Sequence, residues 1–201
     1  MRSRPERSID PSRSGPGSDA ELASAFRRGD RRALAQLYER YKRPLYLFAR
    51  RMLGDPESAI DLVQEVFLRL HERREQLDRP ERFRSWLFTA ARNRCLTELR
   101  HGRRWQPIDQ APADRLVAAP PSDAREREEK LGRLRDALES LRVEYREVLI
   151  LREYQELSYR EIAEVTGSTE SAVKSRLWKA RQTLHAALAP GSEGKEPGRE
   201  L

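Results

Sequence analysis

The sequence has 201 residues, of which 37% are hydrophobic and 36% are charged, and its formal net charge is +7. A chain of this length holds one or two small domains, and its excess of basic residues favours a polyanionic partner, most simply nucleic acid. The single cysteine, Cys95, excludes an internal disulfide framework, and the absence of a run of about 18 apolar residues excludes a membrane span, so we expect a cytosolic protein.

The N-terminal residues predict a tail followed by helices. Residues 1–17 are rich in Arg, Ser, Pro and Gly, a composition that cannot bury enough apolar surface to order itself. Order is expected to begin at Ser18, which forms a capping-box pattern with Glu21. A short helix and then a longer one follow to Leu53, with apolar residues at helical spacing. Pro44 lies inside the longer helix and predicts a kink or a division there.

A stop and restart at Gly54-Asp55-Pro56 predicts a further helix that runs to about Arg74. One face of this helix is apolar and belongs to the core. The neighbouring face carries two carboxylates, an amide and an exposed leucine at helical spacing. In a basic protein this pattern favours a protein-docking patch, although an ordinary solvated face fits the charge pattern alone. The four residues of the patch are Asp61, Gln64, Glu65 and Leu68.

The next predicted helix, from about Phe83 to about Arg100, mixes aromatic, amide and basic side chains. Trp86, Asn93 and Arg100 share one face, with further arginines around it. Ring stacking, hydrogen bonds to base edges and phosphate neutralisation are what single-stranded DNA recognition needs. A core position for Trp86 is an equally good interpretation, whereas an amide such as Asn93 has little use in a core.

A proline-rich stretch without apolar periodicity, residues 105–127, predicts a linker. Helix is expected to resume near Ala124, with a single apolar stripe that runs to Leu149. No segment alternates with period two, so the predicted fold class is all-α, with two small helical domains on a flexible tether. The predicted boundaries are a tail over 1–17, domains over 18–104 and 128–189, and a second tail over 190–201.

The C-terminal domain contains the local chemistry of a helix-turn-helix. Ser158 and Glu161 form a second capping box, and Gly167 supplies the positive φ that ends the first helix. The second helix carries a basic face, for which a solvated amphipathic helix is the plainer alternative. The candidate DNA contacts are Ser168, Ser171, Lys174, Ser175, Arg176, Lys179 and Arg181.

Two sets of motifs, one in each predicted domain, resemble the same protein family. The run Asp61-Leu62-Val63-Gln64-Glu65-Val66-Phe67, followed by Phe83-Arg84-Ser85-Trp86-Leu87 and Asn93, resembles region 2 of bacterial extracytoplasmic-function sigma factors. The run Glu161-Ile162-Ala163, followed by Val173-Lys174-Ser175-Arg176-Leu177 and Ala180-Arg181, is similar to region 4 of the same family. The two sets stand in the family's order with a linker between them.

The resemblance implies a promoter-specificity subunit of RNA polymerase. The acidic patch would then dock on the clamp helices of the β′ subunit, and region 4 would bind the β flap while its second helix enters the major groove of the −35 element. The loop from Leu77 to Arg84 would capture a flipped base of the −10 element. The −10 contacts so implied are Arg79, Arg82, Phe83, Arg84, Trp86, Asn93 and Arg100.

The sequence departs from the family at Ser171-Ala172, where Gly-Thr is common, so one −35 contact is lost or replaced. An anti-sigma factor is a further partner that the resemblance implies. The histidines are scattered and no glycine-rich phosphate loop is present, so we expect neither an enzyme nor a cofactor, metal or small-molecule substrate. Two rivals remain open: a helix-turn-helix regulator that acts without polymerase, and a sigma mimic that sequesters an anti-sigma factor.

Overall fold

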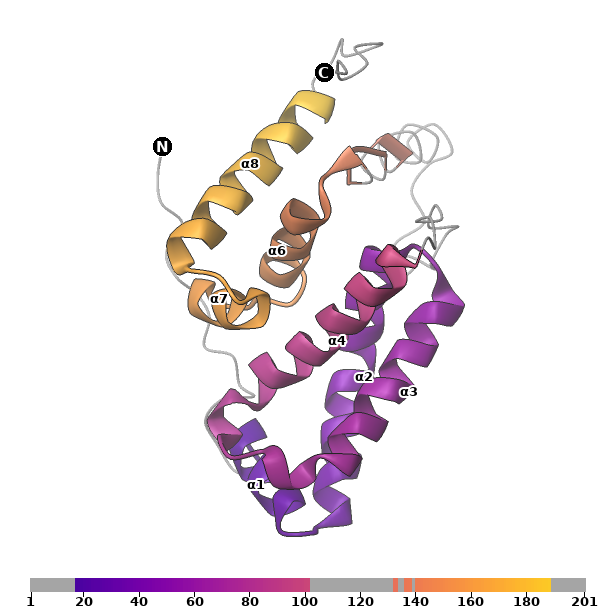
Figure 1. The fold of residues 1–201 in the computed structure, drawn as a ribbon, viewed down its shortest axis with the longest axis vertical. Coiled ribbons are helices and arrows are strands. Elements are labelled where there is room, and N and C mark those ends of the chain that lie inside the picture. Colours follow the sequence, from indigo (N-terminus) through magenta and orange to yellow (C-terminus); the bar gives the residue numbers. More distant parts are fainter. Residues whose placement is uncertain (1–16, 102–131, 134–135, 139, 189–201) are drawn as a thin grey trace, which may run out of the picture.

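The computed structural model describes residues 17–101, 132–133, 136–138 and 140–188. The predicted linker and the predicted tails lie outside these residues, apart from Gly17. Every regular element in the described part is a helix, as the all-α prediction required (Figure 1). The helices form an N-terminal group and a C-terminal group, and together these confirm the expected pair of helical domains.

The N-terminal group contains four α-helices and two short 3₁₀ helices. The α-helices are α1 (Asp19–Arg27), α2 (Arg31–Leu53), α3 (Pro56–Glu72) and α4 (Phe83–Arg100), and the 3₁₀ helices η1 (Arg74–Gln76) and η2 (Pro80–Arg82) connect α3 to α4. Helix α2 packs against each of the other three α-helices. Edge-to-face pairs of buried rings, such as Phe48 against Phe88 at 5.7 Å between centroids, fill the space between them.

The boundaries of these helices follow local chemistry. The side chain of Ser18 accepts from the backbone N–H of Glu21, and the Glu21 carboxylate accepts in return from the backbone N–H of Ser18, so the predicted capping box is confirmed. Gly54 ends α2 with φ of 79°. Asp55 then caps α3 by accepting from the Ser58 N–H at 2.7 Å. Helix α2 runs unbroken past Pro44, so of the two outcomes expected there, a kink or a division, the division does not occur.

The C-terminal group contains α6 (Val143–Glu153), α7 (Tyr159–Thr166) and α8 (Glu170–Leu188), which pack against one another. The apolar stripe that we expected to form one helix up to Leu149 is interrupted, because Arg142 has an extended backbone and α6 starts after it. The freed carbonyl of Leu141 accepts from the buried guanidinium of Arg146 at 3.2 Å. That hydrogen bond satisfies a group that the break would otherwise leave unpaired.

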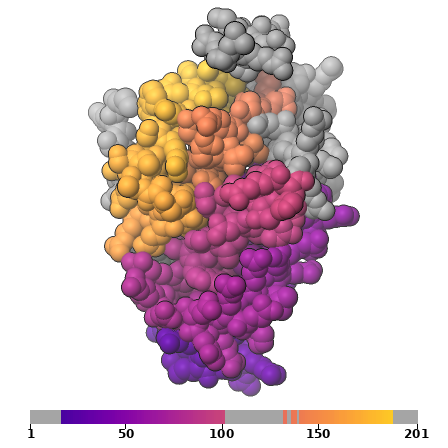
Figure 2. Space-filling view, viewed as in Figure 1, coloured from indigo at the N-terminus to yellow at the C-terminus, as the bar shows by residue number. Residues whose placement is uncertain are grey.

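The two groups are in direct contact. Helix α4 lies against α7, and α2 lies against α6 (Figure 1). The space-filling view shows the C-terminal group seated on α4 (Figure 2). The buried side chains of both groups belong to one hydrophobic cluster. The chain is therefore folded back on itself, and α4 is the surface on which the second group rests.

Candidate docking and nucleic-acid interfaces

The predicted docking patch lies on the solvent side of α3. Asp61 and Gln64 are exposed, and Leu68 is 58% exposed. The Asp55 cap and Pro56 at the first helical position fix where α3 begins, and that start sets which residues face outward. An exposed leucine beside a carboxylate and an amide is an amphipathic surface suited to a helical protein partner.

The fourth patch residue, Glu65, is half-buried and faces α4. Its carboxylate accepts from Arg69 at 2.6 Å and from Arg94, which also pairs with Glu98 at 2.5 Å. Burial opposes the charge on Arg94, but the hydrogen bonds and charges of Glu65 and Glu98 outweigh it and raise the pKa of Arg94. Glu65 thus ties the docking helix to α4, a role that the residue spacing alone did not predict.

The exposed face of α4 carries Asn93, Thr97 and Arg100. A shallow cavity of about 280 Å³ opens beside Asn93 and Thr97, between α3 and α4, with Glu65, Arg69 and Arg94 on its other sides. An amide, a hydroxyl and a guanidinium around one depression can offer hydrogen bonds to a nucleobase and a charge to a phosphate. Thr97 shares the helical face of Asn93, as the residue spacing predicted, whereas nothing in the motifs pointed to Arg69.

The position of Phe83 argues against its predicted role as a DNA contact. Its side chain is fully buried and its ring packs edge-to-face on Tyr41 at 5.7 Å between centroids. Such a ring stabilises the core and cannot stack on a base without leaving it. Trp86 is half-buried and packs against the same core, so part of its ring stays accessible.

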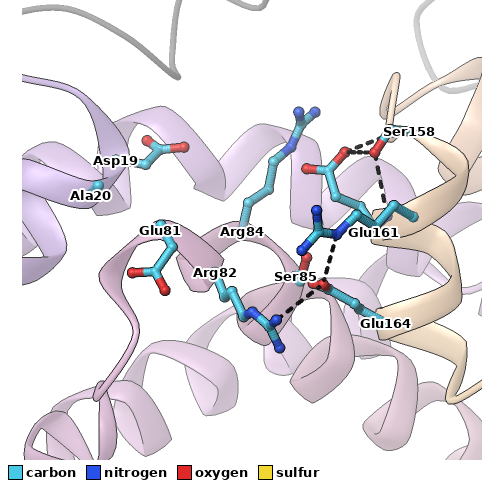
Figure 3. A pocket seen from close by; sticks show the side chains of 10 residues that line it. Asp19, Ala20, Glu81, Arg82, Arg84, Ser85, Ser158, Glu161 and Glu164 are labelled. Atoms are coloured by element: carbon cyan, nitrogen blue, oxygen red, sulfur yellow. Dashed lines mark hydrogen bonds and ion pairs between the residues drawn. The ribbon is translucent and has the colours of Figure 1, made fainter.

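The basic residues before and at the start of α4 face different surroundings. Arg79 is exposed. The guanidinium of Arg82 lies 3.9 Å from the carboxylate of Glu164 on α7, and Arg84 donates to the backbone carbonyl of Gln155. These two predicted DNA contacts therefore line a cavity of about 390 Å³ between the two helical groups, where acidic side chains of α7 also project (Figure 3).

The predicted helix-turn-helix is formed by α7 and α8. The N–H of Ser158 donates to the carboxylate of Glu161 at 2.8 Å, and the N–H of Glu161 donates to the Ser158 hydroxyl, which confirms the second capping box. Gly167 ends α7 with φ of 63°, and the hydroxyl of Thr169 accepts from the N–H of Ala172 at the start of α8. Val173, Leu177 and Ala180 of α8 are buried, which leaves the opposite face outward.

The outward face of α8 holds most of the predicted −35 contacts. Ser171, Lys174, Ser175 and Lys179 are exposed. Trp178 is 62% exposed among them, which is unusual for the largest apolar side chain and adds a flat ring to the basic face.

The other three predicted −35 contacts are partly engaged within the protein. Arg176 is half-buried, and the Ser168 hydroxyl bonds to the Thr166 hydroxyl at 2.7 Å. Arg181 is exposed but forms an ion pair with Glu153 of α6 at 2.6 Å. Ser171, Lys174, Ser175 and Lys179 are therefore the best placed to meet DNA first.

Within the described part of the chain, no group of three or more His, Cys, Asp and Glu side chains could hold a metal ion. None of the described helices combines the length and the apolar character needed to cross a bilayer. Cys95 is fully buried in α4.

Two family models match the chain, one in its N-terminal half and one in its C-terminal half. Residues 37–105 match the model of sigma-70 region 2, and residues 131–184 match that of sigma-70 region 4. The chain is 33% identical over 180 residues to the RNA polymerase sigma factor NccH of Alcaligenes xylosoxydans xylosoxydans, covering 86% of this chain and 96% of that protein.

A mycobacterial relative and one solved structure extend the comparison. The chain is 33% identical over 171 residues to the ECF RNA polymerase sigma factor SigM of Mycobacterium tuberculosis, covering 85% of each chain. The structure of CnrH in complex with the cytosolic domain of CnrY superposes with a TM-score of 0.66 at 29% identity, covering 85% of this chain and 96% of that one.

Proposed function

The chain belongs to the extracytoplasmic-function sigma factors of the sigma-70 family, and from this premise we propose how its surfaces divide the work of promoter recognition. As an alternative sigma factor it binds core RNA polymerase and directs promoter-specific transcription initiation. The observation that carries the proposal is the pairing of two exposed surfaces of different character, an amphipathic acidic patch on α3 and a basic face on α8.

The patch on α3 is proposed to dock on the β′ clamp helices. Asp61 and Gln64 supply polar contacts around Leu68, whose exposed side chain becomes buried on binding. Burying a leucine side chain contributes about 1.5–3 kcal/mol. Glu65 is proposed to act at the edge of the patch, because its carboxylate already binds Arg69 and Arg94.

The exposed face of α4 and the loop before it are proposed to read the −10 element. Asn93 lies beside the cavity between α3 and α4, where its amide can pair with the edge of an unstacked base. Arg79 and Arg100 are exposed and can neutralise phosphates, and Trp86 offers the accessible part of its ring for stacking. Arg82 and Arg84 join this set only after they leave their partners on the C-terminal group.

Helix α8 is proposed to enter the major groove of the −35 element, with region 4 on the β flap. Lys174 and Lys179 supply positive charge on the exposed face of the helix. Ser171 stands where the family commonly has glycine. Residues 18–104 and 128–189 are proposed as the two functional units, with 105–127 between them. Tethering both units to polymerase raises the effective concentration of each unit at its own promoter element. Two weak DNA contacts then act together and select one promoter.

An anti-sigma factor is the proposed regulatory partner. The similar protein CnrH was solved in complex with the cytosolic domain of CnrY, and its fold covers most of this chain. The two rivals are less well supported. A regulator that acts without polymerase would have no use for a domain that matches region 2 and exposes an acidic patch. A sigma mimic would not need an arginine-rich α4 with Asn93 exposed.

Run-off transcription with purified core polymerase on a genomic promoter library tests the proposal. The chain should redirect start sites to a set that shares two sequence boxes, and Asp61→Arg should remove both this activity and co-purification with polymerase. Start sites that are the same with and without the protein would refute the assignment.

A further inference from the structure

We propose that Tyr41 and Asp19 are positioning residues for the −10 loop (residues 77–84). The inference rests on the −10 function proposed above and goes beyond it, because both side chains are buried and neither belongs to the surface that would touch DNA. Tyr41 links the start of α1 to the end of the loop. This link sets the shape in which the loop meets an unstacked base.

The −10 loop is held at its ends and exposed in its middle. Leu77 and Phe83 are buried, whereas Asp78, Arg79 and Glu81 are exposed. The regular part of the loop is the single 3₁₀ turn η2, and one such turn has too few internal hydrogen bonds to fix its own conformation. The exposed part of the loop therefore takes its conformation from the elements on which the loop packs.

The end of the loop packs on Tyr41. The rings of Phe83 and Tyr41 meet edge-to-face, with 67° between their planes. Phe83 is the first residue of α4 and directly follows η2, so this contact fixes the point at which the loop enters the helix. Phe83 would thus support −10 recognition from inside the core, without touching DNA itself.

The hydroxyl of the same tyrosine reaches α1. It donates to the carboxylate of Asp19, which also accepts from Arg40 Nη1 at 2.6 Å. Arg40 donates in addition to the carbonyl of Gly17 at 2.9 Å. Tyr41 is 4% exposed and Asp19 is 7% exposed, so water could not easily replace either partner if the bond broke. Helix α2 therefore holds the first turn of α1 in a defined place.

Helix α1 is in turn an element on which the loop packs. It contacts η1, η2 and the start of α4. Asp19 and Ala20 line the same cavity as Glu81 and Arg82 of the loop, as Figure 3 shows. A helix of 9 residues is not stable by itself in water, so its position depends on its tertiary contacts. A shift at the start of α1 would therefore reach the loop.

A simpler role for Asp19 is to stabilise α1 alone. A carboxylate in the first turn does so through the helix dipole, wherever the helix lies. That role needs no partner on another helix, and an exposed side chain would fill it equally well. The burial of Asp19 against a buried hydroxyl is a tertiary arrangement, and its consequence falls on the loop that packs beside it.

Base discrimination in open-complex formation separates positioning from folding. The full-length chain, bound to core polymerase, is tested on a promoter found by run-off transcription and on derivatives with every base at each −10 and −35 position. Permanganate footprinting gives the rate of opening for each promoter. For each element we define a discrimination ratio as the rate with the best base divided by the rate with the worst. Fewer active molecules lower all rates equally and leave both ratios unchanged, whereas a displaced loop lowers the −10 ratio alone.

Two variants break the proposed link from opposite ends. Tyr41→Phe removes the hydroxyl and keeps the ring. It should lower the −10 ratio at least about threefold, because a hydrogen bond to a charged group is worth about tenfold or more. Asp19→Ala removes the acceptor without removing a core side chain and should lower the −10 ratio at least as much. The double variant should lose no more than Asp19→Ala, since both changes remove one bond. Tyr46→Phe deletes a hydroxyl from another tyrosine of α2 and should leave both ratios unchanged.

The outcomes distinguish the inference from the function on which it rests. A lower −10 ratio in both single variants, with an unchanged −35 ratio and no further loss in the double variant, supports the proposal. A wild-type −10 ratio in either folded variant, as judged by circular dichroism, would overturn it. An equal fall of both ratios, or a larger loss in the double variant, would overturn it as well. A wild-type protein that shows base preference at −35 and none at −10 would instead refute the −10 assignment.

Discussion

The proposed −35 helix carries two basic residues, Lys174 and Arg181, that differ in their partners within the protein. They should therefore differ in the salt dependence of DNA binding that each contributes. Lys174 is exposed, with its Nζ 5.6 Å from the centroid of the Tyr159 ring. Arg181 pairs with Glu153 at 2.6 Å, and both side chains are about half exposed. A contact between Lys174 and a phosphate would release counterions, whereas Arg181 already has a neutralising partner.

The size of the effect follows from counterion release. Each phosphate contact steepens the salt dependence of log K by about 0.9, so between about 50 mM and about 200 mM salt one contact changes affinity by about 3.5-fold. Lys174→Ala should therefore flatten the slope by about 0.9. Arg181→Ala should flatten it less, and Glu153→Gln should steepen it, because it frees Arg181 for DNA.

Fluorescence anisotropy at several salt concentrations measures these slopes, with a duplex that carries a promoter found by run-off transcription. Arg142→Ala is the matched control, since Arg142 is exposed at the start of α6 rather than on α8. A slope for Lys174→Ala that equals the wild-type slope would remove Lys174 from the interface. A Glu153→Gln slope no steeper than wild type would show that the ion pair does not limit Arg181.

Three further predictions concern the other surfaces. Asp61→Arg should reduce affinity for core polymerase at least about tenfold in a pull-down titration, because it places a cation in an acidic patch. Glu39→Arg on α2 is the control, and an equal loss of affinity in both variants would point to a general charge effect. Asn93→Ala should slow open-complex formation, followed by permanganate footprinting, while polymerase affinity stays unchanged; parallel loss of both would indicate a folding defect. Gly167→Ala should lower the free energy of unfolding by about 1 kcal/mol in urea titrations, because a residue with a Cβ is strained at a φ of 63°. The strain is confined to the backbone, since the added Cβ would meet no atom within 4 Å. An unchanged free energy of unfolding would mean that the turn relaxes.

Local chemistry made the helix boundaries predictable. Ser18 and Ser158 cap their helices because a hydroxyl and a glutamate three residues later satisfy each other's backbone donors. Gly54 and Gly167 end helices because each needs a positive φ. These signals involve residues close in sequence, so no knowledge of the fold was required to interpret them.

Tertiary packing decided the rest of the site. Phe83 follows a loop rich in arginine, and only its packing on Tyr41 shows that it belongs to the core. Glu65 has the spacing of a docking residue, but its carboxylate meets Arg94 on another helix. The break before α6 depends on Arg146 satisfying the Leu141 carbonyl, a contact that apolar periodicity does not encode.

The separation of charge within the molecule explains how one basic chain can bind both an enzyme and DNA. Asp61 and Leu68 are both exposed on α3, so the docking patch presents an accessible carboxylate beside an apolar side chain. Glu65, which does face arginines, fixes α3 to α4 and thereby sets the distance between the docking surface and the cavity beside Asn93. Polymerase binding would then position the −10 reading surface directly, since the two surfaces share one rigid pair of helices.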